Sequence, residues 1–116
     1  MKAEGRDTAL LWDMLGAAGK AAALAERLTL EAYLADGIAQ LAVERAIEII
    51  GEAARGVSAS FQSAQPEIPW RKIIGQRHVI AHDYGEIDHG RLWLVATVDV
   101  PKLIAPLRPL LPPGQD

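Results

Sequence analysis

The feature that most constrains the fold is a stripe of small and apolar residues between residues 38 and 57. Its members recur at alternating spacings of four and three, a period that fits an α-helix and not a β-strand. They are Ala39, Val43, Ala46, Ile50, Ala53 and Val57. Because small side chains let a neighbouring helix approach closely, we predict a long helix here that packs against another helix.

The chain before this stripe is also expected to be helical. A first helix is predicted over residues 8–28, with Asp7 or Thr8 able to cap its first turn. Thr29 can cap a short helical turn that follows it. Asp36 then interrupts the chain and can cap the helix that carries the stripe.

Two further helices are expected after the stripe. Residues 57–67 are rich in Ser, Gln and Pro and lack a sustained period, so we expect a loop or a frayed helix end. A third long helix is predicted over residues 69–84, because proline suits its first turn and Gly85 can follow its last. Asp88 can cap a fourth helix over residues 89–98.

The last part of the chain contains several prolines, which limit its helices. Asp99 and Pro101 suit the cap and first turn of a short fifth helix, and Pro106 and Pro109 should keep it short. The predicted fold class is therefore all-α, an up-and-down bundle of four main helices plus a short C-terminal helix. We expect a single domain over residues 1–116, with a proline-rich tail over residues 107–116.

Composition excludes several classes of protein. Cysteine is absent, which excludes disulfides and thiolate metal sites and favours a reducing, cytoplasmic location. No stretch approaches the roughly 18 uninterrupted apolar residues of a membrane span, and the acidic N-terminus does not resemble a signal peptide. The net charge of −3 predicts no general basic surface for nucleic acid. Any RNA contact must therefore be local, or completed by a second subunit.

The densest group of reactive side chains lies in residues 77–84, which hold two of the three histidines, an arginine and a tyrosine. On a helix, Arg77 and Tyr84 fall on nearly the same face, whereas Arg77 and His82 are about 140° apart. Arg77 can meet His82 only through its long side chain, through fraying of the last turn, or through a second copy of the helix. His78 and His82 do share a face, and the helix C-terminus favours their protonated forms.

The spacing Arg77-x-x-x-x-His82-x-Tyr84 resembles the Arg-x4-6-His motif of the HEPN superfamily, and in this form that of the HepT-like toxins. Flanking residues agree with the HepT-like family over roughly residues 7–105. The matching segments are Glu48-Ile49-Ile50-Gly51-Glu52-Ala53, Ile68-Pro69-Trp70, Ile73-Ile74-Gly75, His82-Asp83-Tyr84 and Leu92-Trp93.

The resemblance implies an endoribonuclease toxin that needs neither metal nor cofactor and builds its site across a homodimer. Arg77 would then hold the scissile phosphate, and His82 would move protons. One His82 cannot easily serve as base and acid in the same step, whereas two copies can. The resemblance also implies that a minimal nucleotidyltransferase antitoxin modifies Tyr84 with AMP and so blocks the toxin.

Supporting residues are expected on the helix of residues 38–57, where Glu44, Glu48 and Glu52 share one face. One interpretation is a solvated charged face in which Glu48 pairs with Arg45 and Glu52 with Arg55. The other is that Glu48 or Glu52 orients Arg77 or His82 across the bundle. His78 and Asp83 are candidate helpers within the motif itself.

Three other functions remain open from the residues alone. His78 and His82 could ligate a metal with Asp83 or His89, although the glutamate of the zincin pattern does not follow His78. The pair His82-Asp83 also occurs in HD phosphohydrolases, which need further ligands that this chain lacks. Finally, the domain could be non-catalytic and only bind nucleotides or a partner. His89 is expected to be solvated at a helix start.

Overall fold

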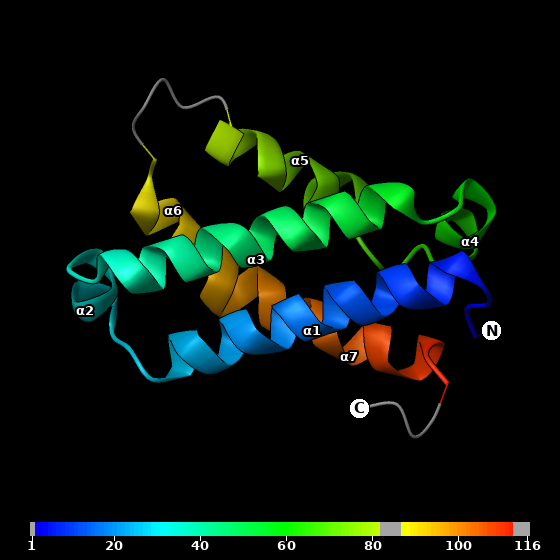
Figure 1. Ribbon diagram of the computed structural model, residues 1–116, viewed down its shortest axis with the longest axis horizontal. Helices are drawn as coiled ribbons and strands as arrows, with labels where there is room; N and C mark the ends of the chain where they lie inside the picture. The colour runs from blue at the N-terminus through cyan, green and yellow to red at the C-terminus, as the bar shows by residue number, and fades with distance from the viewer. Residues whose placement is uncertain (1, 82–86, 113–116) are drawn as a thin grey trace.

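The computed structural model describes residues 2–81 and 87–112 (Figure 1), without the side chains of residues 77–81. It confirms an all-α fold, since the described ranges contain helices and no strand. The elements are α1 (Arg6–Glu26), α2 (Leu30–Leu34), α3 (Gly37–Gly56), α4 (Ala59–Ala64), α5 (Trp70–Ala81), α6 (His89–Leu94), the π-helical segment η1 (Val95–Asp99), α7 (Val100–Leu107) and the 3-10 turn η2 (Arg108–Leu110).

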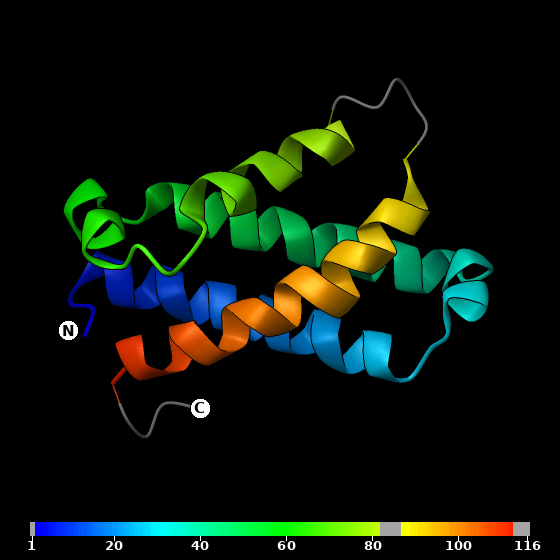
Figure 2. The ribbon, with the colours of Figure 1, turned by 180° about the vertical axis from the view of Figure 1, so that it is seen from behind.

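The bundle is built around the pair α1 and α3, which make the most extensive contact between described elements. All six residues of the predicted stripe on α3 are buried, which confirms the helix and its packing face. The facing stripe on α1 is also rich in alanine, and Ala18 is completely buried. The two helices lie side by side in Figure 1, while α6, η1 and α7 cross behind them, as Figure 2 shows.

Three of the predicted caps are confirmed. The side chains of Thr29, Asp36 and Asp88 each accept a hydrogen bond from a backbone N–H in the first turn of the helix that follows. These bonds satisfy N–H groups that would otherwise have no partner within the helix. They fix where α2, α3 and α6 begin.

The prediction for the start of α1 was wrong, and so was the loop expected over residues 57–67. Gly5 stands at the N-cap of α1, and no side chain caps that helix. The carboxylate of Asp7 instead accepts hydrogen bonds from the N–H and Oγ of Ser58, at 2.9 and 2.6 Å. Ser58 is the N-cap of α4, a helix that periodicity missed because it is only six residues long.

The C-terminal part also differs from the prediction of a helix restarting at Asp99. The chain runs from α6 through η1 into α7 without a break, because the backbone of Asp99 and Val100 stays helical. Pro106 lies inside α7 and does not end it. Residues 107–111, placed by sequence in a proline-rich tail, contribute three buried leucines to the core.

Candidate active site on α5

Helix α5 carries the start of the motif, and its N-terminal half is fixed by apolar contacts. Ile68, Trp70 and Ile73 are buried. The indole N–H of Trp70 donates to the carbonyl oxygen of Gln65 at 3.1 Å, so the start of α5 is also held by a buried hydrogen bond. Among the described elements, α3 is the one against which α5 packs extensively.

Helix α5 runs antiparallel to α3, so its C-terminal end lies over the first half of α3 (Figures 1 and 2). Arg77 and His78 belong to this end of α5, and their side chains lie outside the described residues. His82, Asp83 and Tyr84 also lie outside the described residues. The mutual geometry of Arg77 and His82 therefore stays a prediction.

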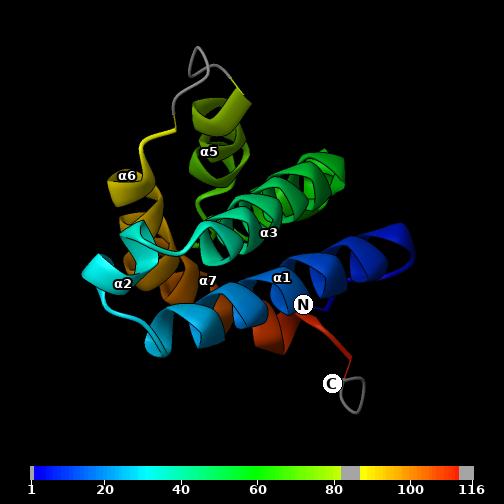
Figure 3. The same cartoon turned by 60° about the vertical axis from the view of Figure 1, so that its left-hand side comes forward.

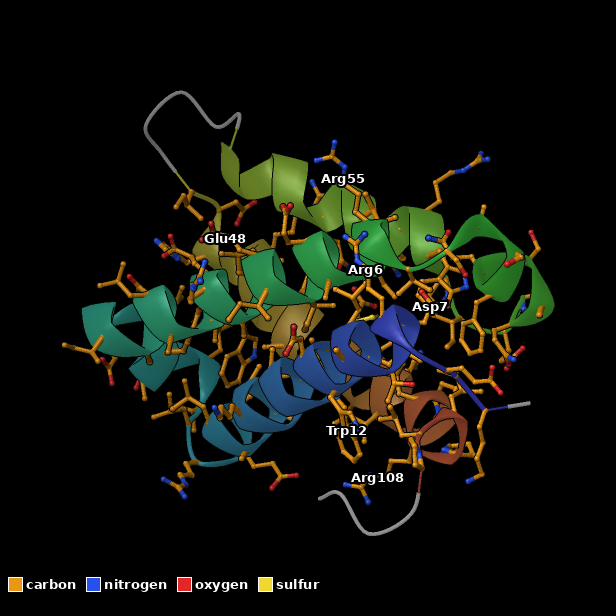
Figure 4. All side chains as sticks on the ribbon, turned by 45° about the vertical axis from the view of Figure 1, so that its right-hand side comes forward. Arg6, Asp7, Trp12, Glu48, Arg55 and Arg108 are labelled. Carbon is orange, nitrogen blue, oxygen red and sulfur yellow. The ribbon has the colours of Figure 1, made fainter. Side chains whose placement is uncertain are left out.

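The three glutamates Glu44, Glu48 and Glu52 follow one another at four-residue spacing along α3. Glu48 and Glu52 are exposed, whereas Glu44 is half-buried. Figure 4 shows Glu48 on the part of α3 that lies beneath the end of α5. Both Glu48 and Arg45 are described residues, and they form no ion pair with each other. Which group on α5 the Glu48 carboxylate contacts stays a prediction.

A polar contact also joins α5 to Asp99 at the end of η1. One carboxylate oxygen of Asp99 accepts from the Lys72 ammonium at 3.1 Å, and the other accepts from the Gln76 amide at 3.0 Å. Lys72, Gln76 and Asp99 line two clefts, of about 260 Å³ and about 320 Å³. Sequence analysis missed this contact, since it assigned Asp99 to a helix cap.

The family model described as Ribonuclease HepT-like matches residues 14–110. The chain belongs to the HepT-like ribonuclease family. It is similar to "Putative RNase MJ1380" of Methanocaldococcus jannaschii, with 34% identity over 95 residues that cover 82% of this chain and 87% of that protein. It is also similar to "Probable ribonuclease HepT" of Thermococcus cleftensis, with 41% identity over 73 residues, 63% of this chain and 66% of that protein. No solved structure matches significantly.

In this HepT-like domain an aromatic cluster joins α2 to α6, the helix that follows the motif in sequence. Tyr33 of α2 is completely buried, and its ring contacts those of His89 and Trp93 on α6. His89 is half-buried against Tyr33 rather than solvated, so that prediction was wrong. Within the described ranges, neither the Tyr33 hydroxyl nor the buried Nδ1 of His89 has a hydrogen-bond partner. The cluster could not be predicted from sequence, because Tyr33 is about 60 residues from His89 and Trp93.

Over residues 2–81 and 87–112, as far as side chains are described, no group of three or more His, Asp or Glu residues could hold a metal ion. The metal alternative involves His78 and His82, whose side chains are not among those described. No described helix is long and apolar enough to cross a membrane.

The buried Tyr33 predicts a fall in stability at high pH. Burial, and secondarily the charge of Glu44, raises the pKa of Tyr33 to about 12 from its ordinary value of 10.0. Because the folded state disfavours the tyrosinate, Tyr33 does not lower the free energy of unfolding below pH 10. The free energy of unfolding then falls as pH rises from about 10 to about 12. Urea unfolding of wild type across this range should show the decline. Tyr33→Phe should flatten it, and should cost little at pH 7 because the hydroxyl has no described partner to lose.

Proposed function

We propose that the protein is the toxin of a toxin–antitoxin pair, an endoribonuclease that cleaves RNA without a metal ion. The observation that carries the proposal is an intact Arg77-x-x-x-x-His82-x-Tyr84 motif in a chain of the HepT-like ribonuclease family. The motif begins at the end of α5, a helix that packs against α3, and α3 carries the exposed carboxylate of Glu48. That placement supports Glu48 as a residue that orients Arg77 or His82.

In the proposed reaction the 2′-hydroxyl of a ribose attacks the adjacent phosphorus, and the bond to the leaving 5′-oxygen breaks. His82 of one subunit takes the hydroxyl proton, and His82 of the second subunit gives a proton to the leaving oxygen. Arg77 offsets the negative charge that develops on the phosphate, for which its planar guanidinium is suited. The products are a cyclic 2′,3′-phosphate and a 5′-hydroxyl.

A homodimer is part of the proposal, because one His82 cannot easily fill both proton-transfer roles. Exposed apolar side chains at the corner of α2 and α3 support it. Leu34, Ile38 and Leu41 are 50%, 78% and 65% exposed, and several large apolar side chains exposed within eight residues are typical of an interaction site. In Figure 1 this corner lies in the half of the molecule in which α5 ends. A second copy seated on it would cover the half of the bundle in which α5 ends.

The proposed antitoxin is a minimal nucleotidyltransferase that transfers AMP from ATP to the Tyr84 hydroxyl, releasing pyrophosphate. The added phosphate would repel RNA at a site that binds phosphate. A second candidate is a non-catalytic module that binds nucleotides or the nucleotidyltransferase. The cleft of about 260 Å³ among α3, α5 and α7 supports this candidate, since its apolar floor is edged by charged groups.

The test of cleavage uses Arg77→Ala and His82→Ala with purified RNA. Each variant should lose activity by ~10²–10⁴-fold while keeping the helical circular dichroism of wild type. Arg71→Ala is the matched control, because Arg71 is an exposed arginine in the first turn of the same helix.

Activity should persist in EDTA, which separates this mechanism from a His78/His82 metal site. Wild type that leaves RNA intact under all conditions, yet binds the nucleotidyltransferase, would establish the non-catalytic module.

The dimer is tested by Ile38→Asp, which places a charge in the proposed apolar interface. Sedimentation should show wild type as a dimer at tens of micromolar, and the variant as a folded monomer without activity. Val98→Asp is the control, since Val98 is also an exposed apolar residue (42%) but lies on η1. A monomeric wild type that still cleaves RNA would refute the composite site.

Modification is tested by incubating the protein with the nucleotidyltransferase and ATP. Wild type should gain one AMP per chain, seen by mass spectrometry, and lose activity. Tyr84→Phe should gain no AMP and stay active, whereas Tyr33→Phe should behave as wild type because Tyr33 is completely buried. AMP found on another residue would contradict the assignment of Tyr84.

A further inference from the structure

The π-helical segment η1 changes which residue faces the core. Leu92, Ala96 and Leu103 are buried, and in a regular α-helix residue 99 would continue this stripe at spacings of three and four. The N–H of Val100 instead donates to the carbonyl of Val95, five residues back, so this turn holds one extra residue. Val100 is consequently buried at 3% exposure, and Asp99 turns to the flank, where its side chain is 29% exposed.

The sequence around η1 explains why the turn widens. Pro101 has no N–H and cannot donate to the carbonyl of Thr97, so the regular hydrogen-bond pattern is interrupted there. The Thr97 hydroxyl donates to the carbonyl of Trp93 at 2.8 Å, a side-chain bond that competes with the backbone pattern. Burying an aspartate in the stripe would also be costly. The wide turn avoids that cost.

Turned outward, Asp99 reaches two successive turns of α5. Lys72 and Gln76 are four residues apart, and each donates to a different carboxylate oxygen of Asp99. Lys72, Gln76 and Asp99 line both clefts, so these bonds lie at the border that the clefts share, and in Figure 3 the C-terminal end of α5 stands apart from α6. Gln76 immediately precedes Arg77, so the bond lies at the turn where the motif begins.

We propose that Asp99 is a positioning residue for the reaction, which it serves by holding the turn of α5 that carries Arg77. This inference rests on the proposed ribonuclease function. Stability alone does not account for the contact, since Lys72 is 59% exposed and exposed ion pairs stabilise proteins little. The effect of the contact on the position of α5 matters more than its effect on stability, because a shift of about 1 Å in a reacting group can lower a rate by ~10²-fold.

The kinetic test compares Asp99→Ala, Gln76→Ala and the double variant. Each should lower kcat by about 10- to 100-fold with little change in KM, and the double variant should be no slower than either, because both changes break one contact. Asp99→Asn should recover most of kcat, since its amide can still hydrogen-bond to the Gln76 amide. Lys72→Met, which removes the ion pair alone, is the matched control and should resemble wild type. Equal kcat in all variants would overturn the inference.

Amide hydrogen exchange tests the same contact without relying on catalysis. In Asp99→Ala, exchange of residues 77–81 should speed up by about tenfold, while the α1–α3 core keeps its protection. If exchange speeds up but wild type itself cleaves no RNA, Asp99 still positions α5 and the proposed function fails. If exchange is unchanged, or if it speeds up in an active enzyme whose kcat does not fall, Asp99 is not a positioning residue.

Discussion

The contact between α1 and α3 determines where the other helices can lie. Both contact faces are rich in alanine; Ala18 in the middle of α1 and Ala54 in the last turn of α3 are completely buried. The close approach extends to the end of α3, where a Cβ added to Gly56 would lie 3.1 Å from a methyl group of Leu10. Each helix of this close pair packs against a further helix on another of its sides. Helix α7 packs against α1, and α5 packs against α3.

This arrangement holds the two sides of α5 by different kinds of interaction. On the α3 side, burial of Trp70 and Ile73 provides a non-directional hydrophobic contact. On the other side, the described contact is polar and directional, through Asp99. Hydrophobic burial keeps α5 on the bundle, whereas hydrogen bonds restrict its rotation and translation. The proposed reaction depends on the direction of Arg77, and only the directional hydrogen bonds can fix that direction.

Much of the fold could be predicted from sequence because it depends on local chemistry. The stripe on α3 and the caps Thr29, Asp36 and Asp88 need only neighbouring residues, and all were confirmed. The remainder depends on tertiary contacts. Asp7 could not be assigned to Ser58, 51 residues away, because its own helix offered an equally plausible role. Of the candidate site, the motif was found by its spacing, whereas Asp99, 23 residues from Gln76, gave no such signal.

The charge of the chain also indicates that positioning matters more here than electrostatic attraction. RNA-binding proteins usually gain affinity from many cationic contacts with phosphates. This chain has a net charge of −3, and one of its cations, Lys72, is already paired with Asp99. Long-range steering of RNA should therefore be weak. An RNase with this charge must rely on short-range contacts at a few phosphates, and in the proposed mechanism such contacts require that Arg77 is held in a fixed direction.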